Sequence, residues 1–271
     1  MSQRILVTGA AGLVGAFLRS RLARPGRTLR LLDTAPQAPV APGEAVELIQ
    51  GSVTDADAMA AACTDVDAVV HLGGLSTEQA WEEILRTNIH GTYVVLEAAR
   101  RAGVPRVVFA SSNHAVGFRP NDGTTAPDYA FPAPDTLYGV GKVAGEALGS
   151  LYHHRYGLDV VCLRIGSCFE RPKDTRMLAT WLSPDDCARL VEASLAVPAP
   201  GFRIAWGVSA NTRGWFSLAE ARALGFDPQD DAEQYAADVP EQDDPHAHRY
   251  LGGPFCSPAL DQPLPQPEEN R

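Results

Sequence analysis

The chain has 271 residues, 45% of them hydrophobic and 21% charged, which is the ordinary composition of a globular protein with a sizeable core. Its formal net charge of −10 disfavours nucleic acid and anionic membranes as partners. No apolar run reaches the roughly 18–20 residues of a membrane span, and we expect the N-terminus to enter a strand without a signal peptide. The five cysteines are an odd set without a C-x-x-C pair, so we expect no disulfide framework, no metal site and a cytoplasmic location.

The first 33 residues hold the parts of a dinucleotide site in the order that such a site needs. A short apolar run over residues 4–8 predicts a buried strand, and a glycine turn follows over residues 9–15. The sequence then predicts a helix over residues 16–23 and a second strand over residues 29–32, which ends at Asp33. A glycine turn alone is common in other loops, and it is the register of strand, helix and acid that indicates a dinucleotide.

The three glycines of this turn have separate tasks in such a site. Gly9 permits the tight turn, Gly12 lets the backbone approach a pyrophosphate, and Gly15 lets the helix lie close to the strand. The free N–H groups at the start of the helix would then hold the phosphates. Asp33 is placed to accept hydrogen bonds from the adenosine ribose hydroxyls, which favours NAD over NADP.

Strands and helices continue to alternate towards residue 168. The further strands are predicted over residues 47–50, 68–72, 107–110 and 160–164, and the further helices over residues 54–62, 77–103 and 137–156. Thr54 is the expected N-cap of the first of these helices. The second is expected to bury one apolar face, formed by Leu85, Ile89, Tyr93 and Leu96. This alternation predicts an α/β protein with a Rossmann-type, doubly wound parallel sheet.

The regular alternation of predicted strands and helices ends after residue 170. Ser183 is the expected cap of a helix that ends near Ala196, and residues 202–206 predict a last strand. From Ser209 onwards the sequence is irregular and rich in Trp, Pro and Asp, which predicts a small cap over the strand ends. We therefore expect three parts, namely an NAD-binding Rossmann domain with the catalytic residues over 1–170, a substrate-binding and capping segment that partly packs back on it over 171–256, and a Pro- and Glu-rich disordered tail over 257–271.

Tyr138 and Lys142 lie four residues apart and therefore share one face of the predicted helix. An ammonium near a phenol stabilises the phenolate, lowers the pKa of the tyrosine and prepares it to act as a general base. The Y-x-x-x-K spacing alone is common on helices. Here the spacing indicates a catalytic pair, because it follows a dinucleotide turn and a strand that ends in Ser111-Ser112.

These motifs together resemble a known superfamily. The chain is similar to the extended short-chain dehydrogenases/reductases, which include NAD-dependent epimerases and dehydratases, in Thr8-Gly9-Ala10-Ala11-Gly12-x-x-Gly15, Asp33, Ser111-Ser112 and Tyr138-x-x-x-Lys142. Apart from the tail, it also closely resembles the bacterial NAD-dependent uronate dehydrogenases, in His71-Leu72-Gly73-Gly74-Leu75-Ser76, Ala110-Ser111-Ser112-Asn113-His114, Arg164-Ile165-Gly166-Ser167-Cys168, Arg176-Met177-Leu178-x-Thr180-Trp181 and Trp206-Gly207-x-Ser209-Ala210-Asn211.

The resemblance implies a role for each matched residue. Tyr138 would be the general base, Lys142 its electrostatic helper and a ribose ligand, and Ser112 the hydroxyl that holds the reacting oxygen. Arg176 would bind the carboxylate of the substrate, a task that suits a planar guanidinium. The residues implied in cofactor binding are Gly9, Gly12, Leu13, Val14, Gly15, Asp33, Ser52, Val53, Leu72, Asn88, Tyr138, Lys142 and Cys168. The residues implied in substrate binding are Ser76, Ser112, Asn113, His114, Tyr138, Ser167, Arg176 and Phe255.

Four of these residues have a second interpretation. His114 could be an ordinary loop histidine, and Phe255 could serve only in packing. Asn88 could brace its own helix, and Arg176 could form a surface ion pair with the nearby Asp174.

Two positions depart from the family pattern. Ser52 stands where the superfamily usually has an acid that contacts the adenine, so one charged contact to the cofactor is lost. Gly141 stands where serine or threonine is usual. Glycine weakens a helix by roughly 1 kcal/mol relative to alanine, but it leaves Tyr138 and Lys142 in place.

The resemblance implies an NAD-dependent oxidation of D-galacturonate or D-glucuronate at C1. The ring form would lose the proton of its anomeric hydroxyl to Tyr138 and a hydride from C1 to NAD, giving NADH and an aldaro-lactone that opens to the aldaric acid. We expect no metal, and the resemblance implies a homo-oligomer. Two other functions remain open. One is an epimerase or reductase of another sugar or nucleotide sugar, which would retain NAD and form no net NADH, and the other is a non-catalytic NAD-responsive regulator.

Overall fold

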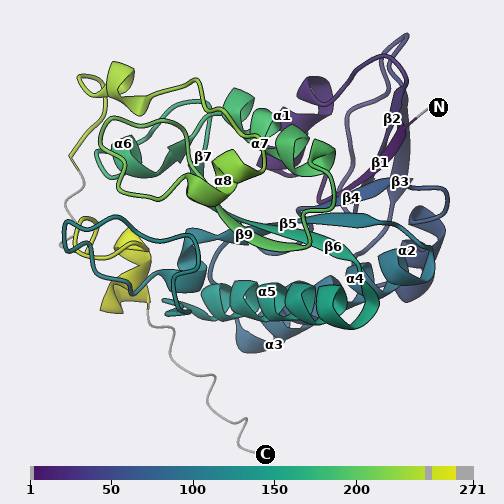
Figure 1. Cartoon of the computed structure of the whole chain (residues 1–271), viewed down its shortest axis with the longest axis horizontal. Coiled ribbons are helices and arrows are strands. Elements are labelled where there is room, and N and C mark those ends of the chain that lie inside the picture. The colour runs from purple at the N-terminus through teal and green to yellow at the C-terminus, as the bar shows by residue number, and fades with distance from the viewer. Residues whose placement is uncertain (1–2, 242–245, 261–271) are drawn as a thin grey trace, which may run out of the picture.

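The structure is a computed structural model that describes residues 3–241 and 246–260. Its centre is a seven-stranded parallel sheet in the order β3-β2-β1-β4-β5-β6-β9 (Figure 1). The strands are β1 (Gln3–Thr8), β2 (Arg27–Asp33), β3 (Val46–Gln50), β4 (Ala68–His71), β5 (Arg106–Ser112), β6 (Asp159–Ile165) and β9 (Phe202–Gly207). The strand order reverses between β1 and β4, which confirms the predicted doubly wound α/β sheet.

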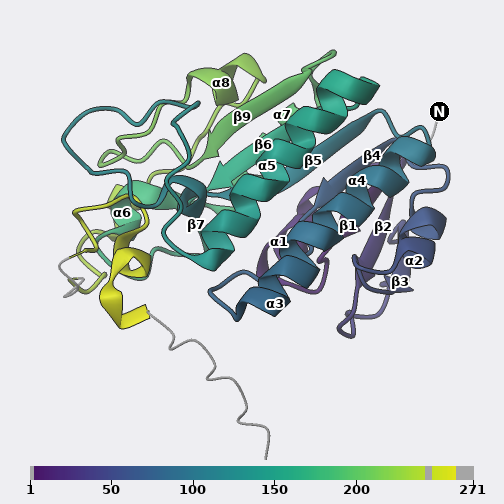
Figure 2. The ribbon, with the colours of Figure 1, turned by 90° about the horizontal axis from the view of Figure 1, so that it is seen from below.

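Helices cover both faces of this sheet (Figures 1 and 2). The larger ones are α2 (Ala56–Ala62), α4 (Gly91–Arg101) and α5 (Leu137–Tyr156) on one face, and α1 (Leu13–Arg21) and α7 (Pro184–Ala196) on the other. Alternate residues of β1 enter the two cores, since Ile5 and Val7 pack with α1 and α7 and Leu6 packs with α2 and α4. Because both faces are covered, the central strands carry continuous apolar runs, such as residues 5–7 of β1 and 160–163 of β6.

The first two helices begin at residues that differ slightly from the prediction. α1 begins at Leu13 rather than Ala16, because Gly12 is already its N-cap. The N-cap of α2 is Asp55 rather than Thr54, and its carboxylate accepts hydrogen bonds from two backbone N–H groups of the first turn. The earlier start of α1 brings its unpaired N–H groups directly to the glycine turn.

The helix expected over residues 77–103 is shorter and less regular than predicted. Residues 77–80 are not helical, and the helical run over residues 81–101 consists of α3 (Trp81–Glu83), a π-helix η1 (Ile84–His90) and α4. A π-helical stretch has a wider turn than an α-helix, and it therefore changes which side chains face inward. Leu85 and Tyr93, expected in the core, are each 43% exposed, whereas Ile84 and Asn88 are buried.

The ranges of α5 and α7 agree with the prediction because their ends have strong local signals. The side chain of Thr136 caps α5, and that of Ser183 caps α7, each accepting a backbone N–H of the first turn. α5 ends at Gly157, whose φ of 74° is left-handed. Local sequence thus defines both ends of the helix that carries the expected catalytic pair.

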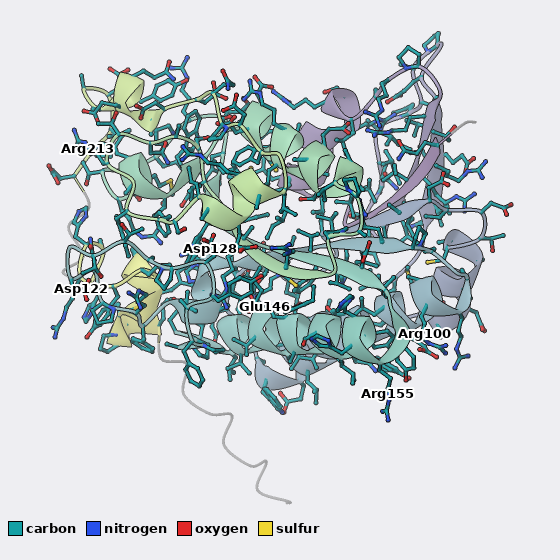
Figure 3. All side chains as sticks on the ribbon, in the orientation of Figure 1. Arg100, Asp122, Asp128, Glu146, Arg155 and Arg213 are labelled. Carbon is teal, nitrogen blue, oxygen red and sulfur yellow. The ribbon has the colours of Figure 1, made fainter. Side chains whose placement is uncertain are left out.

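A buried ion pair fastens α5 to the sheet. Glu146 accepts hydrogen bonds of 2.7 and 2.8 Å from Arg164 on β6 and of 2.6 Å from the Ser111 hydroxyl on β5. Arg164 also donates to the carbonyl oxygen of Ala130, at 3.0 Å. Glu146 lies between α5 and the sheet, whereas Arg155 on the same helix projects outward (Figure 3). Since both charges are buried, removing either one would leave an unpaired charge in the core.

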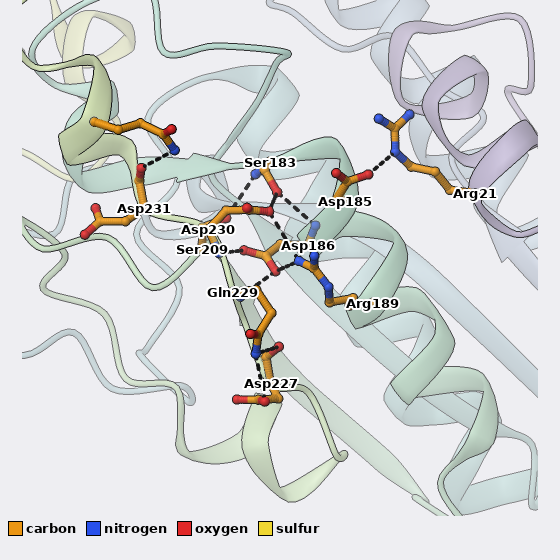
Figure 4. A network of polar contacts seen from close by, with 11 residues as sticks. Arg21, Ser183, Asp185, Asp186, Arg189, Ser209, Asp227, Gln229, Asp230 and Asp231 are labelled. Atoms are coloured by element: carbon orange, nitrogen blue, oxygen red, sulfur yellow. Dashed lines mark hydrogen bonds and ion pairs between the residues drawn. The ribbon is translucent and has the colours of Figure 1, made fainter.

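A second buried carboxylate holds the chain that follows β9 (Figure 4). Asp186 in α7 accepts hydrogen bonds from the backbone N–H groups of Gln229 and Asp230, at 2.9 and 3.0 Å. Arg189, one turn further along α7, forms ion pairs with both Asp186 and Asp230. Residues 229–230 are thereby tied to a helix that covers the main sheet.

The chain after β6 contains short elements that were not predicted from the sequence. They are β7 (Ser167–Cys168), α6 (Met177–Thr180), β8 (Trp181–Leu182) and α8 (Ala219–Ala223). β7 and β8 pair in parallel as a small separate sheet. The expected tail is described only at its start, where Pro258–Leu260 form a 3₁₀ helix and so differ from the expected disorder, while residues 261–271 lie outside the described residues. Within the described chain, no helix combines the length and apolarity needed to span a bilayer.

Candidate active site

A cavity of about 890 Å³ lies at the carboxyl ends of the parallel strands, where open α/β sheets bind their ligands. It extends from the glycine turn after β1 to residues 252–255 near the C-terminus. The predicted residues on its wall are Gly9, Gly12, Leu13, Val14, Gly15, Asp33, Ser52, Val53, Leu72, Ser76, Ser112, His114, Tyr138, Lys142, Ser167, Cys168, Arg176 and Phe255. The fold thus brings all the expected cofactor residues except Asn88, and all the expected substrate residues except Asn113, to one cavity.

The glycine turn has the geometry of a phosphate cradle. Gly9 has a φ of 70°, and a Cβ there would lie 2.7 Å from the backbone nitrogen of Gly73. A Cβ on Gly15 would lie 2.6 Å from the carbonyl oxygen of Ala10. Gly12 caps α1 without any side-chain hydrogen bond, so the N–H groups of the first turn remain available to a pyrophosphate.

Asp33 and Ser52 line the part of the cavity where an adenosine would lie. The Asp33 carboxylate accepts 2.9 Å hydrogen bonds from the backbone N–H groups of Ala11 and Ala35, which fix it beside the glycine turn. Ser52 shares a 2.8 Å hydrogen bond with the hydroxyl of Thr54. The cradle and the fixed acid fit the pyrophosphate and ribose of NAD.

Tyr138 and Lys142 reach the cavity from the start of α5, and both are buried. The Lys142 ammonium donates a 2.6 Å hydrogen bond to the carbonyl oxygen of Ala110 and lies 5.5 Å from the centre of the Tyr138 ring. Burial raises the pKa of Tyr138 to about 12, although a hydrogen bond with Ser112 acts in the opposite direction. Burial lowers the pKa of Lys142 to about 8.

The expected lowering of the Tyr138 pKa by Lys142 is therefore wrong for this structure. The ammonium is directed at a backbone carbonyl, and the loss of hydration around the phenol dominates. The placement of the three groups agrees with the prediction all the same. Ser112 lines the same cavity as Tyr138 and Lys142, and its hydroxyl accepts the backbone N–H of His114, at 3.2 Å.

Arg176 lines the cavity at the N-cap of α6. Its Nη2 donates a 2.7 Å hydrogen bond to the carbonyl oxygen of Leu251, whereas its buried Nε has no hydrogen-bond partner in the described chain. Gly253 has a φ of 63°, and a Cβ there would lie 2.2 Å from Nε, so the backbone passes directly over the guanidinium. Burial lowers the pKa of Arg176, while the charges of Asp174 and Asp135 raise it. A fixed guanidinium in a cavity wall suits a planar carboxylate.

Ser167, Cys168 and Ser76 line the cavity from two other strand ends. The Ser167 hydroxyl shares a 2.9 Å hydrogen bond with that of Thr180. A hydrogen bond with Cys187, together with burial, raises the pKa of the Cys168 thiol, which therefore stays neutral. Ser76 is exposed on the loop after β4.

His114 and Phe255 form an aromatic stack on the cavity wall. Their ring centroids are 4.1 Å apart at an interplanar angle of 24°. The His114 ring also meets the Tyr138 ring edge-on, with centroids 5.7 Å apart. The stack joins the loop after β5 to the C-terminal segment.

Asn88 and Asn113 are buried but do not line the cavity. Asn88 accepts from the backbone N–H of Leu75 at 2.8 Å and donates to its carbonyl oxygen at 2.9 Å, which braces the loop of Ser76. Asn113 donates to the carbonyl oxygen of Leu251, at 3.3 Å. Asn88 also accounts for the departure at position 141, because a Cβ on that glycine would lie 3.1 Å from the Asn88 Cβ.

Two carboxylates near the site, those of Glu78 and Asp135, were not predicted from the sequence. The Glu78 carboxylate accepts from the backbone N–H groups of Leu137 and Tyr138, at 3.2 and 2.8 Å, and so caps α5 from the loop after β4. Asp135 lies just before the N-terminus of α5, where acids are common, so its position is only a weak indication of a role in the site. Glu78 has no such signal, because it lies 59 residues from the backbone that it bonds.

The comparisons with known proteins agree with this geometry. Residues 5–184 match the NAD dependent epimerase/dehydratase family, and the chain therefore belongs to that family. Over 258 residues it is 44% identical to the uronate dehydrogenase of Pseudomonas putida, with 93% of this chain and 95% of that protein covered. The resemblance drawn from the motifs is thus confirmed.

Two solved structures are also similar to this chain. A uronate dehydrogenase variant from Agrobacterium tumefaciens, complexed with NAD, superposes with a TM-score of 0.89 at 40% identity and covers 97% of this chain and 100% of its own. A glucuronic acid dehydrogenase from Chromohalobacter salexigens has a TM-score of 0.88 at 41% identity and covers 94% of this chain and 97% of its own. Over residues 3–241 and 246–260, no group of three or more His, Cys, Asp or Glu side chains is placed to hold a metal ion.

Proposed function

We propose that the protein is an NAD-dependent uronate dehydrogenase that oxidises D-galacturonate or D-glucuronate at C1. The observation that carries the proposal is one cavity that joins a glycine cradle, the pair Tyr138 and Lys142, and the guanidinium of Arg176. The similarity to uronate dehydrogenases over nearly the whole chain supports it. NAD, when bound, supplies the acceptor for a hydride.

The cofactor would lie along the wall that begins at the glycine turn. The N–H groups at the start of α1 would hold the pyrophosphate, and Asp33 would accept from the adenosine ribose hydroxyls and repel a 2′-phosphate. Lys142 would donate to the second ribose. The remaining wall in this part consists of Leu13, Val14, Ser52, Val53, Leu72 and Cys168.

The chain's own groups then position the sugar and move one proton. Arg176 holds the carboxylate and so fixes the orientation of the ring. Ser112 donates a hydrogen bond to the anomeric oxygen, and Tyr138, after its phenol has released its own proton to solvent, takes the proton of that hydroxyl as a phenolate. The positive charge of the nicotinamide, when NAD is bound, would favour this phenolate. The electron pair of the O–H bond forms the C1=O bond as the C1–H bond breaks and its pair leaves with the hydrogen as hydride. The product is an aldaro-lactone, which water opens to the aldaric acid.

The formation of NADH tests this function directly. Purified protein with NAD is supplied in turn with D-galacturonate, D-glucuronate, D-galactose and D-glucose, and the absorbance of NADH is followed. We expect both uronates to be oxidised with a far higher kcat/KM than the neutral sugars. If neither uronate yields NADH, the substrate assignment is wrong. An epimerase would instead retain NAD without net reduction, and a regulator would keep its biological function after Tyr138→Phe.

Three further proposals concern the organisation of the protein. Residues 1–170 would bind the cofactor and supply Tyr138 and Lys142, residues 171–256 would cap the substrate, and residues 257–271 would be a tail.

Helices on one face of the sheet, among them α3, α4 and α5 (Figure 2), carry exposed apolar side chains, namely Trp81, Leu85, Tyr93 and Leu151. These side chains favour a homo-oligomer, and light scattering measures the oligomeric state. The five cysteines are buried free thiols, which suits the cytoplasm.

A further inference from the structure

A buried carboxylate lies behind the His114 ring. The side chain of Asp135 has no exposed surface, and its Oδ2 lies 2.7 Å from Nδ1 of His114. Its Oδ1 accepts a 3.0 Å hydrogen bond from the hydroxyl of Thr136, which itself caps α5. Both carboxylate oxygens are therefore fixed relative to the helix that carries Tyr138.

The surrounding backbone leaves room for this carboxylate and for little else. A Cβ would lie 1.9 Å from Oδ2 if it were added to Gly117, and 1.8 Å from it if it were added to Gly252. The thiol of Cys256 lies 3.8 Å from the same oxygen. Two segments far apart in the sequence, namely the connection from β5 to α5 and residues 252–256, thus close around Asp135.

The His114 ring is also held on its faces. Phe255 stacks on it at 4.1 Å, and Tyr138 meets it edge-on. A rotation of the ring would break both the stack and the bond to Asp135. His114 lines the cavity, and its Nε2 has no hydrogen-bond partner within the described part of the chain.

We propose that Asp135 is a positioning residue, which fixes the ring and the tautomer of His114 so that Nε2 accepts a hydrogen bond from a hydroxyl of the sugar. An ionised carboxylate can only accept, so the single proton of a neutral imidazole beside it lies on Nδ1, and Nε2 is left as an acceptor. The sugar is then bound at two points, by Arg176 at its carboxylate and by His114 at a hydroxyl. The proposal rests on the proposed uronate dehydrogenase function.

The tautomer can be measured without any reaction. Long-range proton–nitrogen NMR spectra of protein labelled with ¹⁵N-histidine distinguish the two ring nitrogens, and the signal of His114 is the one lost in His114→Gln. We expect a neutral ring with its proton on Nδ1. A proton on Nε2, or on both nitrogens, at neutral pH would overturn the proposal, whatever reaction the enzyme catalyses.

A double-mutant cycle tests the effect on substrate binding. Asp135→Asn is close in size to the native side chain and should raise the KM for the uronate about 10-fold, with the Kd for NAD unchanged. In the His114→Gln background the same substitution should change KM less than about twofold. Equal effects in both backgrounds would show that Asp135 acts only on the fold and would overturn the proposal.

The control is Asp122→Asn, which changes an exposed acid of the same loop (Figure 3) and should leave kcat and KM unchanged. A wild-type protein that forms no NADH from any uronate would overturn the proposed function instead, and the NMR result would still decide the tautomer.

Discussion

The ammonium nitrogen of Lys142 lies 5.5 Å from the centre of the Tyr138 ring, yet its hydrogen bond goes to a backbone carbonyl rather than to the phenol. Burial instead governs both groups, raising the pKa of Tyr138 and lowering that of Lys142. The spacing of four residues on one helix thus places the two side chains correctly, but it does not by itself make an acidic phenol.

The first prediction concerns the titration of Tyr138. Since its pKa is about 12, Tyr138 should remain a neutral phenol up to about pH 10.5, and the phenolate absorbance of wild-type protein and of Tyr138→Phe should rise equally up to that pH. Above that pH the wild type should show additional phenolate absorbance from Tyr138. An extra phenolate in the wild type that titrates below pH 9 would contradict the structure. Tyr138→Phe should also lower kcat by a factor of about 10² to 10⁴ while the Kd for NAD stays the same.

The second prediction concerns Arg176. Arg176→Met removes a charged hydrogen-bond donor from the cavity wall, so the KM for the uronate should rise about 10- to 100-fold. Arg176→Lys should have an intermediate effect, because it retains the charge but not the planar fork. The matched control is Arg213→Met, which removes an exposed arginine paired with Glu233 (Figure 3) and should not change KM. A uronate KM unaffected by Arg176→Met would remove this residue from the site.

The features predicted correctly from the sequence depend on the local backbone. Gly9 takes a left-handed φ directly after β1, and Gly15 lets α1 approach Ala10 within the same β-α unit. Tyr138 and Lys142 are brought together by a single helix. The predictions failed where a distant segment decides the outcome. The π-helical stretch that buries Asn88 packs against α5, and it has no signature in the apolar periodicity.

The carboxylates of Glu78 and Asp135 illustrate the same limit. Each is defined by what the tertiary structure brings to it, a helix N-terminus in one case and the ring of His114 in the other. A pattern search detects neither, because charged loop residues are ordinarily solvated. The motifs therefore predict which residues line the site, and the fold alone reveals which residues hold them in place.

The third prediction concerns the choice of cofactor. Asp33→Asn keeps the size and the acceptor oxygen of the side chain but removes the negative charge beside the glycine turn. The affinity for NAD should fall about 10-fold or more because charge-assisted bonds to the ribose are lost. The affinity for NADP should rise, since a 2′-phosphate is no longer repelled. Titration calorimetry with both cofactors measures this, with the exposed Asp57→Asn as the control, and an unchanged ratio of the two affinities would contradict the role of Asp33.

The fourth prediction concerns the dependence of stability on pH. His71 is buried between the hydroxyls of Thr8 and Thr92, at 2.8 and 3.2 Å, and burial, helped by the charge of Lys142, lowers its pKa to about 3. The unfolded chain binds a proton at this residue near pH 6.5, while the folded protein does not until about pH 3, so its contribution to the free energy of unfolding falls as the pH falls between these values.

Between pH 6.5 and 5 the loss due to His71 should approach about 2 kcal/mol. Urea unfolding of the wild type, His71→Asn and His154→Asn at several pH values isolates this contribution. His71→Asn should be less stable at neutral pH. It should lose less stability on acidification, because it has no imidazole that binds a proton in the unfolded chain but not in the folded protein. His154 is exposed on α5, and its substitution should leave the wild-type profile unchanged. Parallel pH profiles for the wild type and His71→Asn would show that the pKa of His71 is not lowered by folding, and would contradict this prediction.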